Sequence, residues 1–334
     1  MLTEVPTVSI VMPLYNKEQD VSRAINSVLS QTVTDLEIIV INDGSTDKGP
    51  DIVRNINDPR IRIIDQKNAG VSAARNRGIK EARSDLIAFL DADDEWKPDF
   101  LETILTLRKN YPNCSVFATN YIFRRKNNYS RSTIIRGLPR GFKEGILTDY
   151  FKIASQSNPP LCSSTVAVTK KAIEAVGGFS EGVRSGEDLL TWARLAVQFN
   201  IAYTREPKAY FWEPVVVSDR PGRIPDMSDI VGQELQNLLK TVEGAKRNVL
   251  KNYIALWHKM RASAYIQLGE RREALKEIQK AVYFSGFTLK LFVYSGIALL
   301  PNSISIGLFK FMRRVSALNR KSNPDMFKGL KNNA

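Results

Sequence analysis

Three acids follow directly on an apolar run in the stretch Asp85 to Asp94, which reads D-L-I-A-F-L-D-A-D-D. The uncharged run predicts a strand buried on both faces. If the chain stays extended past Leu90, Asp91 and Asp93 point to the same side, because side chains alternate along a strand. Two such carboxylates repel each other unless a cation lies between them, and all-oxygen ligation favours Mg²⁺ or Mn²⁺. The pattern indicates a metal site, and the alternative is a polar turn with helix-capping acids.

The elements that must position these acids alternate along the first part of the chain. Repeated strand and helix patterns predict a parallel, doubly wound α/β sheet with right-handed crossovers. In such sheets, ligands bind outside the carboxyl ends of the strands. The expected strands are Val8–Met12, Leu36–Ile41, Ile61–Ile64 and the run before Asp91, and the expected helices are Glu18–Gln31, Asp51–Ile56 and Val71–Ala82.

Polar segments follow three of these strands. Pro13-Leu14-Tyr15-Asn16 follows the first, Asn42-Asp43-Gly44-Ser45 the second, and Asp91-Ala92-Asp93 the fourth, so all three share one edge. Neither G-x-G-x-x-G nor G-x-x-x-x-G-K-[ST] occurs, which counts against a nicotinamide dehydrogenase and a P-loop kinase. A nucleotide could instead be held by a carboxylate on its ribose or base and by a metal on its phosphates.

A further acidic pair occurs in Gly186-Glu187-Asp188, at the start of an amphipathic helical pattern. Acids in the first turn of a helix are favoured by the helix dipole, so N-terminal capping is the structural alternative to a catalytic role.

Composition and charge limit the protein class. The chain has 334 residues, enough for two domains, with 43% hydrophobic residues and a net charge of +13. Basic residues concentrate in 124–143 and 301–334, which suits nucleic acid, anionic lipid or an acidic substrate, or a solvated surface. Cys114 and Cys162 lie in apolar stretches and are expected to be buried thiols in a reducing compartment. No leader pattern opens the sequence, so cytoplasmic residence is expected.

The composition changes after Tyr210. We expect a domain over residues 1–215, a linker over 216–229 and a helical region over 230–334. Ala262 to Ala274 reads as one tetratricopeptide-type helix pair, too little for a solenoid. Leu289 to Leu300 is mostly apolar but too short to span a bilayer, which takes about 20 residues. It could lie in a membrane interface or form an ordinary buried helix.

The motifs of residues 1–215 resemble the family-2 glycosyltransferases, which have the A-type nucleotide-sugar-binding, Rossmann-like fold. The resemblance implies an α/β, mostly parallel sheet with a C-terminal helical extension. Its motifs follow in the family's order: Val8 to Asn16, Ser30-Gln31-Thr32 with Leu36 to Asp47, Asn68 to Asn76, Asp91-Ala92-Asp93 and Gly186-Glu187-Asp188.

The resemblance also implies roles for individual residues. Asp188 would be the general base, and one displacement would invert the anomeric carbon. Asp91 and Asp93 would hold Mn²⁺ or Mg²⁺ on the diphosphate. The donor-binding residues would be Pro13, Tyr15, Asn16, Glu18, Asp43, Arg75, Asp91 and Ala92, and the acceptor-side residues Asp94, Trp96, Glu187 and Trp192. Asp94 could instead belong to the structure of the loop.

One departure from the family concerns the metal. Many relatives carry a histidine shortly after the tyrosine that ends this domain, whereas Tyr210-Phe211-Trp212-Glu213 offers none. Either Glu213 ligates the metal, or the ion relies on Asp93, phosphate and water.

The expected function is inverting, metal-dependent transfer from a nucleoside-diphosphate sugar, usually a UDP-sugar. The acceptor would be a glycan or lipid-linked glycan in surface polysaccharide synthesis, with the protein cytoplasmic and peripheral on the inner membrane face. The alternative is a catalytically silent scaffold or binding subunit. Nucleic acid is not expected, because the basic patches lack a recognisable reader motif.

Overall fold

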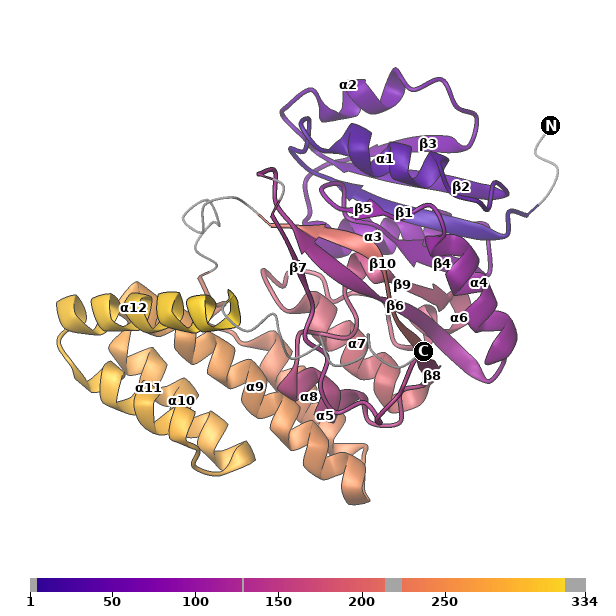
Figure 1. The fold of residues 1–334 in the computed structure, drawn as a ribbon. Coiled ribbons are helices and arrows are strands. Elements are labelled where there is room, and N and C mark those ends of the chain that lie inside the picture. Colours follow the sequence, from indigo (N-terminus) through magenta and orange to yellow (C-terminus); the bar gives the residue numbers. More distant parts are fainter. Residues whose placement is uncertain (1–4, 128, 214–223, 322–334) are drawn as a thin grey trace, which may run out of the picture. The chain divides into compact units, whose positions relative to one another are not determined.

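The computed structural model describes residues 5–127, 129–213 and 224–321. The chain divides into two compact units (Figure 1). Unit 1 comprises residues 1–222 and 226–253, and unit 2 comprises residues 223–225 and 254–334. Much of the expected linker 216–229 lies outside the described residues.

Unit 1 is built on a ten-stranded mixed sheet with the order β3-β2-β1-β4-β9-β6-β10-β5, in which β7 pairs with β6 and β8 with β10. Strands β1 to β4 are parallel, as the sequence predicts. Strand β9 runs antiparallel to both β4 and β6. The strands are β1 (Val8–Leu14), β2 (Leu36–Asp43), β3 (Ile61–Gln66), β4 (Leu86–Phe89), β5 (Glu95–Trp96), β6 (Cys114–Arg124), β7 (Ser130–Ser132), β8 (Glu144–Ile146), β9 (Val166–Thr169) and β10 (Asn200–Trp212).

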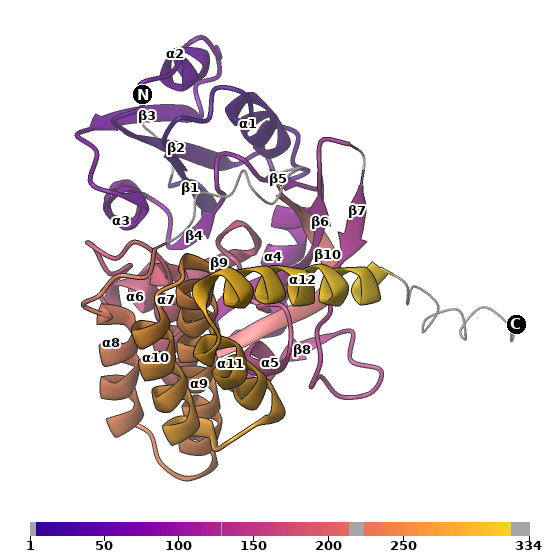
Figure 2. The same cartoon turned by 90° about the vertical axis from the view of Figure 1, so that its left-hand side faces the viewer.

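Helices cover both faces of this sheet (Figure 2). Strand β4 is buried at every residue because it has helices on either side. The helices of unit 1 are α1 (Val21–Leu29), α2 (Gly49–Arg54), α3 (Val71–Glu81), α4 (Phe100–Asn110), α5 (Tyr150–Gln156), α6 (Lys170–Ala175), α7 (Glu187–Gln198), α8 (Ile230–Lys240) and the first part of α9 (Gly244–Leu268), with a short 3₁₀ helix at Ser163–Thr165.

Alternate side chains of the central strands pack against different helices. Ile10 and Met12 lie in one apolar cluster with residues of α1 and α4. On the other face, α3 approaches β1 so closely that a Cβ at Gly78 would lie 2.3 Å from a methyl of Val11. This approach explains the glycine within a helix, where glycine otherwise costs stability.

Unit 2 contains the rest of α9 with α10 (Arg271–Ser285), α11 (Leu289–Leu299) and α12 (Asn302–Lys321). The expected helix pair is present, because Ala262 on α9 and Ala274 and Ala281 on α10 are fully buried in one apolar cluster with α11. None of the helices within the described residues has both the length and the hydropathy needed to cross a bilayer.

Because the central strands are parallel, the sheet has two distinct edges. We call the edge where β1, β2 and β4 finish the carboxyl edge, and the opposite one the amino edge. Strand β10 is parallel to β6, and two antiparallel steps through β9 make β6 parallel to β4. The start of β10 therefore lies at the amino edge.

Candidate functional site

The acids that follow β4 lie on a turn at the carboxyl edge. Strand β4 ends at Phe89, and the amide of Asp94 donates a hydrogen bond to the carbonyl oxygen of Asp91 over 2.9 Å. The prediction that the chain stays extended past Leu90 is therefore wrong, and the alternation of side chains along a strand does not orient these acids. Instead, Asp91 and Asp93 are each oriented by an ion pair with a basic side chain.

Asp91 is held by a buried arginine. The Arg75 guanidinium on α3 lies 2.8 Å from Asp91 and 3.4 Å from Glu187, with only 4% of its side chain exposed. Burial works against its charge, but Asp91, Glu187 and Asp188 outweigh burial and raise the pKa of Arg75. Arg75 therefore joins the turn after β4 to the start of α7.

Asp93 is paired with Lys17, which follows β1. The Lys17 Nζ atom lies 2.5 Å from Asp93 Oδ2, and 39% and 35% of the two side chains are exposed. Burial opposes the charge of Lys17, yet attraction to Asp93, Asp20 and Asp91 raises its pKa. The sequence contains no signal that singles out Lys17, because its role depends on two loops 76 residues apart.

Asp188 begins the helix that Arg75 reaches. Gly186 adopts a left-handed conformation with φ of 86° and turns the chain into α7. Asp188 Oδ1 accepts a hydrogen bond from the amide of Leu189 over 2.7 Å. Burial is the main cause that raises the pKa of the partly exposed Cys162, and Asp94, Asp91 and Asp188 add to it. The acids after β4 and at the start of α7 thus share one electrostatic environment.

The loops after β1 and β2 are hydrogen-bonded to each other. Asn16, with φ of 53°, accepts from the amide of Thr46 over 2.8 Å. Glu18 accepts from the amide of Lys48 over 3.1 Å. Tyr15, which precedes Asn16, has 48% of its surface exposed. Pro13 at the end of β1 is half-buried.

Asp43 at the end of β2 is buried and engaged by the loop that leads into α3. Its Oδ1 accepts from Gln66 Nε2 over 2.8 Å and from the Ala69 amide over 2.9 Å, and its Oδ2 accepts from the Gly70 amide over 2.8 Å. Two carboxylate oxygens offer about four acceptor positions, so one remains in this arrangement.

A family model described as "Glycosyl transferase family 2" matches residues 9–175, half of the chain, and contains most of these loops. The chain belongs to glycosyl transferase family 2. The resemblance to family-2 glycosyltransferases seen in the sequence is confirmed.

Named relatives agree with this family. The chain is 31% identical to the chondroitin synthase of Escherichia coli over 198 residues, 58% of this chain and 27% of that protein. Other curated glycosyltransferases match over 27–32% of their own length, so the matches span about a third or less of the curated relatives.

Solved structures show the same fold. Staphylococcus aureus TarS 1–349 in complex with UDP-GlcNAc has a TM-score of 0.64 at 15% identity and covers 94% of this chain and 92% of TarS. The mannosyltransferase PcManGT of Pyrobaculum calidifontis, in complex with GDP-Man and Mn²⁺, has a TM-score of 0.56 at 17% identity, covering 97% and 89%. The predicted fold class is confirmed, helical extension included.

Within this glycosyltransferase fold, two tryptophans expected on the acceptor side are core residues. Trp96 is 2% exposed, donates from Nε1 to the carbonyl of Ser164 over 2.7 Å and stacks on Phe100. Trp192 is 1% exposed and packs edge-on against Phe179. The acceptor-side prediction is wrong for both. It rested on the positions of these residues beside family motifs, and such a position does not say whether a side chain faces the site or the core.

Asp94 is a structural residue of the turn. It is buried, accepts from Ser164 Oγ over 2.5 Å and from the Trp212 amide over 2.9 Å. Burial, with repulsion from Asp93 and Asp91, raises its pKa well above the usual range. The structure therefore supports the loop role over the acceptor role. Ala92, beside it, is also buried.

Glu213 is engaged by two arginines. Its carboxylate lies 3.0 Å from Arg125 and 2.6 Å from Arg131. Burial alone would raise the pKa of Glu213, but the two guanidinium groups lower it. Two cations bound to one carboxylate do not favour a metal ion there. We therefore leave Glu213 out of the metal site.

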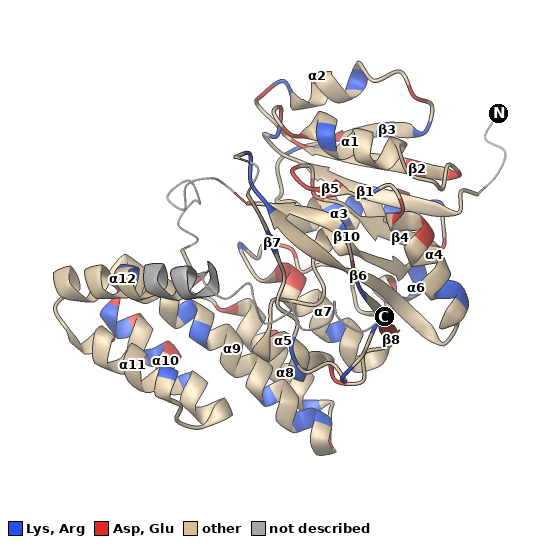
Figure 3. Cartoon of the chain, viewed as in Figure 1, with Lys and Arg blue, Asp and Glu red and all other residues tan. Residues whose placement is uncertain are grey.

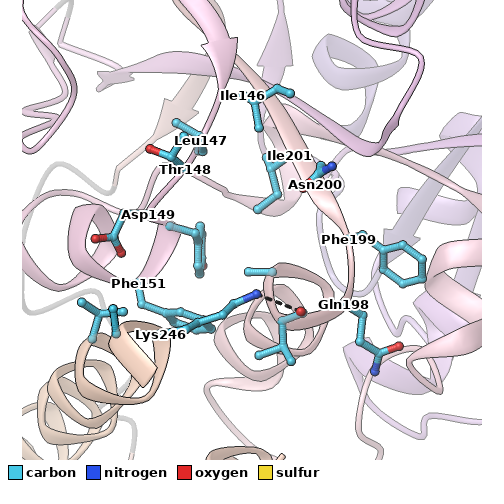
Figure 4. Close-up of a pocket in the computed structure, with 15 residues that line it drawn as sticks. Ile146, Leu147, Thr148, Asp149, Phe151, Gln198, Phe199, Asn200, Ile201 and Lys246 are labelled. Atoms are coloured by element: carbon cyan, nitrogen blue, oxygen red, sulfur yellow. Dashed lines mark hydrogen bonds between the residues drawn. The ribbon is translucent and has the colours of Figure 1, made fainter. Parts of the chain in front are cut away.

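A cavity of about 470 Å³ lies elsewhere, at the amino edge (Figure 4). It is lined by Asp149, which caps α5, by Phe151 of α5, by the end of α7, the start of β10 and Lys246. Lys246 donates to the carbonyl of Val197 over 2.8 Å, and burial lowers its pKa. None of the predicted site residues lines this cavity, so its volume does not identify the site.

Proposed function

We propose that this family member transfers a sugar from a nucleoside-diphosphate sugar to a hydroxyl group of a glycan or lipid-linked glycan. The observation that carries the proposal is Arg75, which holds Asp91 of the candidate metal motif and Glu187 beside the candidate base within one network. That network joins a donor site to an acceptor site, as direct transfer requires. Tyr15 and Asp43 at the neighbouring strand ends would hold the nucleobase.

Asp91 and Asp93 fit a divalent cation. Both are partly exposed carboxylates on one turn, and hard cations such as Mg²⁺ and Mn²⁺ prefer oxygen ligands. Lys17 now balances Asp93, and its long, partly exposed side chain can move away when an ion binds. A bound ion would neutralise charge on the departing diphosphate. The Mn²⁺ complex of PcManGT supports this proposal.

Asp188 would act as the general base. Its Oδ1 accepts one hydrogen bond from the adjacent amide, and no bond to Oδ2 is found among the described residues. Oδ2 would accept the proton of an acceptor hydroxyl while that oxygen attacks the anomeric carbon opposite the diphosphate, which gives inversion. Glu187, held by Arg75, would fix the first turn of α7 and orient the acceptor.

The donor would most simply be a UDP-sugar, because the TarS structure contains UDP-GlcNAc, and the chondroitin synthase relative supports a polysaccharide acceptor. We place the reaction in the cytoplasm, where nucleotide sugars are made. A lipid-linked acceptor would also require the enzyme to reach the inner face of the membrane.

A screen of nucleotide sugars with Mn²⁺ tests this proposal. We expect one UDP-sugar to raise the melting temperature and to release UDP slowly in the presence of Mn²⁺, and EDTA to remove both effects. A chain that binds donors without any hydrolysis or transfer would instead be a silent scaffold. Retention of both effects in EDTA would contradict the metal role.

A further inference from the structure

Four large apolar side chains stand exposed where α10 turns into α11. Tyr283 is 83% exposed, Phe287 64%, Leu289 80% and Phe292 61%. They follow one another through the end of α10, the connecting residues and the first turn of α11. We call these four residues the α10–α11 patch. Soluble proteins rarely expose apolar side chains in such groups unless the surface binds something.

Phe287, Leu289 and Phe292 lie close together in space. The rings of Phe287 and Phe292 meet edge-on with centroids 6.2 Å apart. Phe292 lies one helical turn after Leu289 on α11, so both lie on the same helix face. The patch is therefore continuous from the connection onto α11.

The patch does not result from an incomplete core. Leu291 and Tyr294 on α11 are buried against α10 and α12 in the apolar cluster of unit 2, and Tyr294 packs on Phe309 of α12. Helix α11 therefore has one apolar face that holds the unit together and a second that is exposed. The second face contributes nothing to this core.

Basic residues flank the patch along the sequence. From Ile278 to Pro324 the sequence has seven basic residues and no acid. Lys290 is exposed between Leu289 and Leu291. Lys259 donates to Ser285 at the end of α10, and burial together with repulsion from Lys290 lowers its pKa. Figure 3 shows basic residues on the helices of this unit, together with acidic residues on α10.

Exposed aromatic and aliphatic side chains beside Lys290 and Lys259 match the interface of an anionic bilayer. The apolar groups enter the acyl boundary and the ammonium groups stay with the lipid phosphates. We propose that the α10–α11 patch binds the surface of an anionic membrane. It would do so without spanning the bilayer, consistent with the absence of a membrane-spanning helix among the described residues.

This surface begins earlier in the chain than the sequence indicated. The apolar stretch considered there starts at Leu289, whereas Tyr283 and Phe287 precede it. The inference bears on the proposed function, because lipid-linked acceptors lie at membranes. Vesicle binding, however, needs neither donor nor acceptor. The proposed membrane surface and the proposed transfer reaction can therefore be disproved independently.

Cosedimentation of the full chain with vesicles tests the proposal. We expect binding to equimolar phosphatidylglycerol and phosphatidylcholine, weak binding to phosphatidylcholine alone, and loss of binding at high salt. The double variant Phe287→Ser, Phe292→Ser should lose at least about tenfold in vesicle affinity, because most of the exposed ring area is removed. Lys290→Glu should lose at least about fivefold, since one basic residue near such a surface contributes about 1 kcal/mol.

Matched variants control for nonspecific effects. Val5→Ser and Met227→Ser remove exposed apolar side chains of unit 1 and should leave binding unchanged. Asp188→Asn should bind vesicles as the wild type does, which separates this proposal from the catalytic one. Unchanged binding of the double-serine variant would overturn the proposal. So would a wild-type dimer, seen by light scattering, that the double-serine variant converts to a monomer.

Discussion

Both edges of the unit 1 sheet carry carboxylates beside arginines, but the carboxylates differ in burial and in the number of hydrogen bonds they accept. At the amino edge, Glu37 on β2 is 2% exposed and its oxygens accept from Ser9 Oγ, the Arg83 amide and Arg83 Nε at 2.6–2.9 Å. At the carboxyl edge, Asp91 and Asp93 each have one cationic partner and remain partly exposed.

The difference separates a carboxylate whose hydrogen bonds stabilise the fold from carboxylates that remain available to a ligand. Glu37 ties β1, β2 and the residues before β4 together, and Arg62 occupies its fourth acceptor position with a donor nitrogen 3.5 Å away. Asp91 and Asp93 retain acceptor positions, and their partner charges can be redistributed. Charge alone therefore does not mark a site, whereas incomplete hydrogen bonding of partly exposed acids does.

The largest expected effect comes from Asp188→Asn. Transfer should fall by about 10²–10⁴-fold, the usual contribution of a general base, while UDP affinity and melting temperature stay near wild type. Initial rates and UDP titrations measure this. Substantial residual transfer would remove Asp188 from the base role and weaken the distinction between the edges.

Asp93→Ala should mainly affect the donor. We expect Mn²⁺-dependent affinity for the UDP-sugar to fall at least about tenfold, in line with the loss of a metal ligand. Stability should change little, because the pair with Lys17 is more than a third exposed and such pairs contribute about 0–1 kcal/mol. Calorimetric titrations with Mn²⁺ and with EDTA provide the comparison, and undiminished affinity would contradict the ligand assignment.

Glu37→Gln should show the opposite behaviour. The amide cannot accept all the bonds that the carboxylate accepts, so the free energy of unfolding should fall by about 1–3 kcal/mol with donor affinity unchanged. Denaturant titration measures the first quantity and UDP binding the second. If Glu37→Gln lost donor affinity without losing stability, Glu37 would belong to the donor site and not to the residues that stabilise the fold.

Glu213→Gln should have the smallest effect, which is a change in how the free energy of unfolding depends on pH. Burial would raise the pKa of Glu213, but its two arginine partners outweigh burial and lower it. Its stabilising contribution is therefore present above the unfolded pKa of about 4.3 and is lost as pH falls through the lower folded value. Wild type should be more stable than the variant at pH 7, and the gap should close at low pH. Altered Mn²⁺ dependence of transfer would return Glu213 to the metal site.

Much of the fold could be predicted from the sequence because its signals are local. Apolar runs and helical periodicity place β1 to β4 and the helices between them within a few residues of their observed ends. The antiparallel insertion of β9 between β4 and β6 was not predicted, since pairing of distant strands leaves no periodic trace.

The candidate site was predictable only in part. The order of the motifs identified Asp43, Asp91 and Asp188 as candidate site residues. Residues whose position depends on distant contacts were missed or assigned to the wrong side. Lys17 pairs across 76 residues, and Trp96 and Trp192 are held in the core by packing that spacing does not reveal.

Arg75 has one more consequence, which concerns the order of events. Its guanidinium is shared between Asp91 and Glu187. A cation bound to Asp91 would compete with Arg75 for that carboxylate and would turn the arginine toward Glu187, at the start of α7. Loading of the donor would then complete the acceptor side, so the two substrates should bind in sequence, nucleotide sugar first.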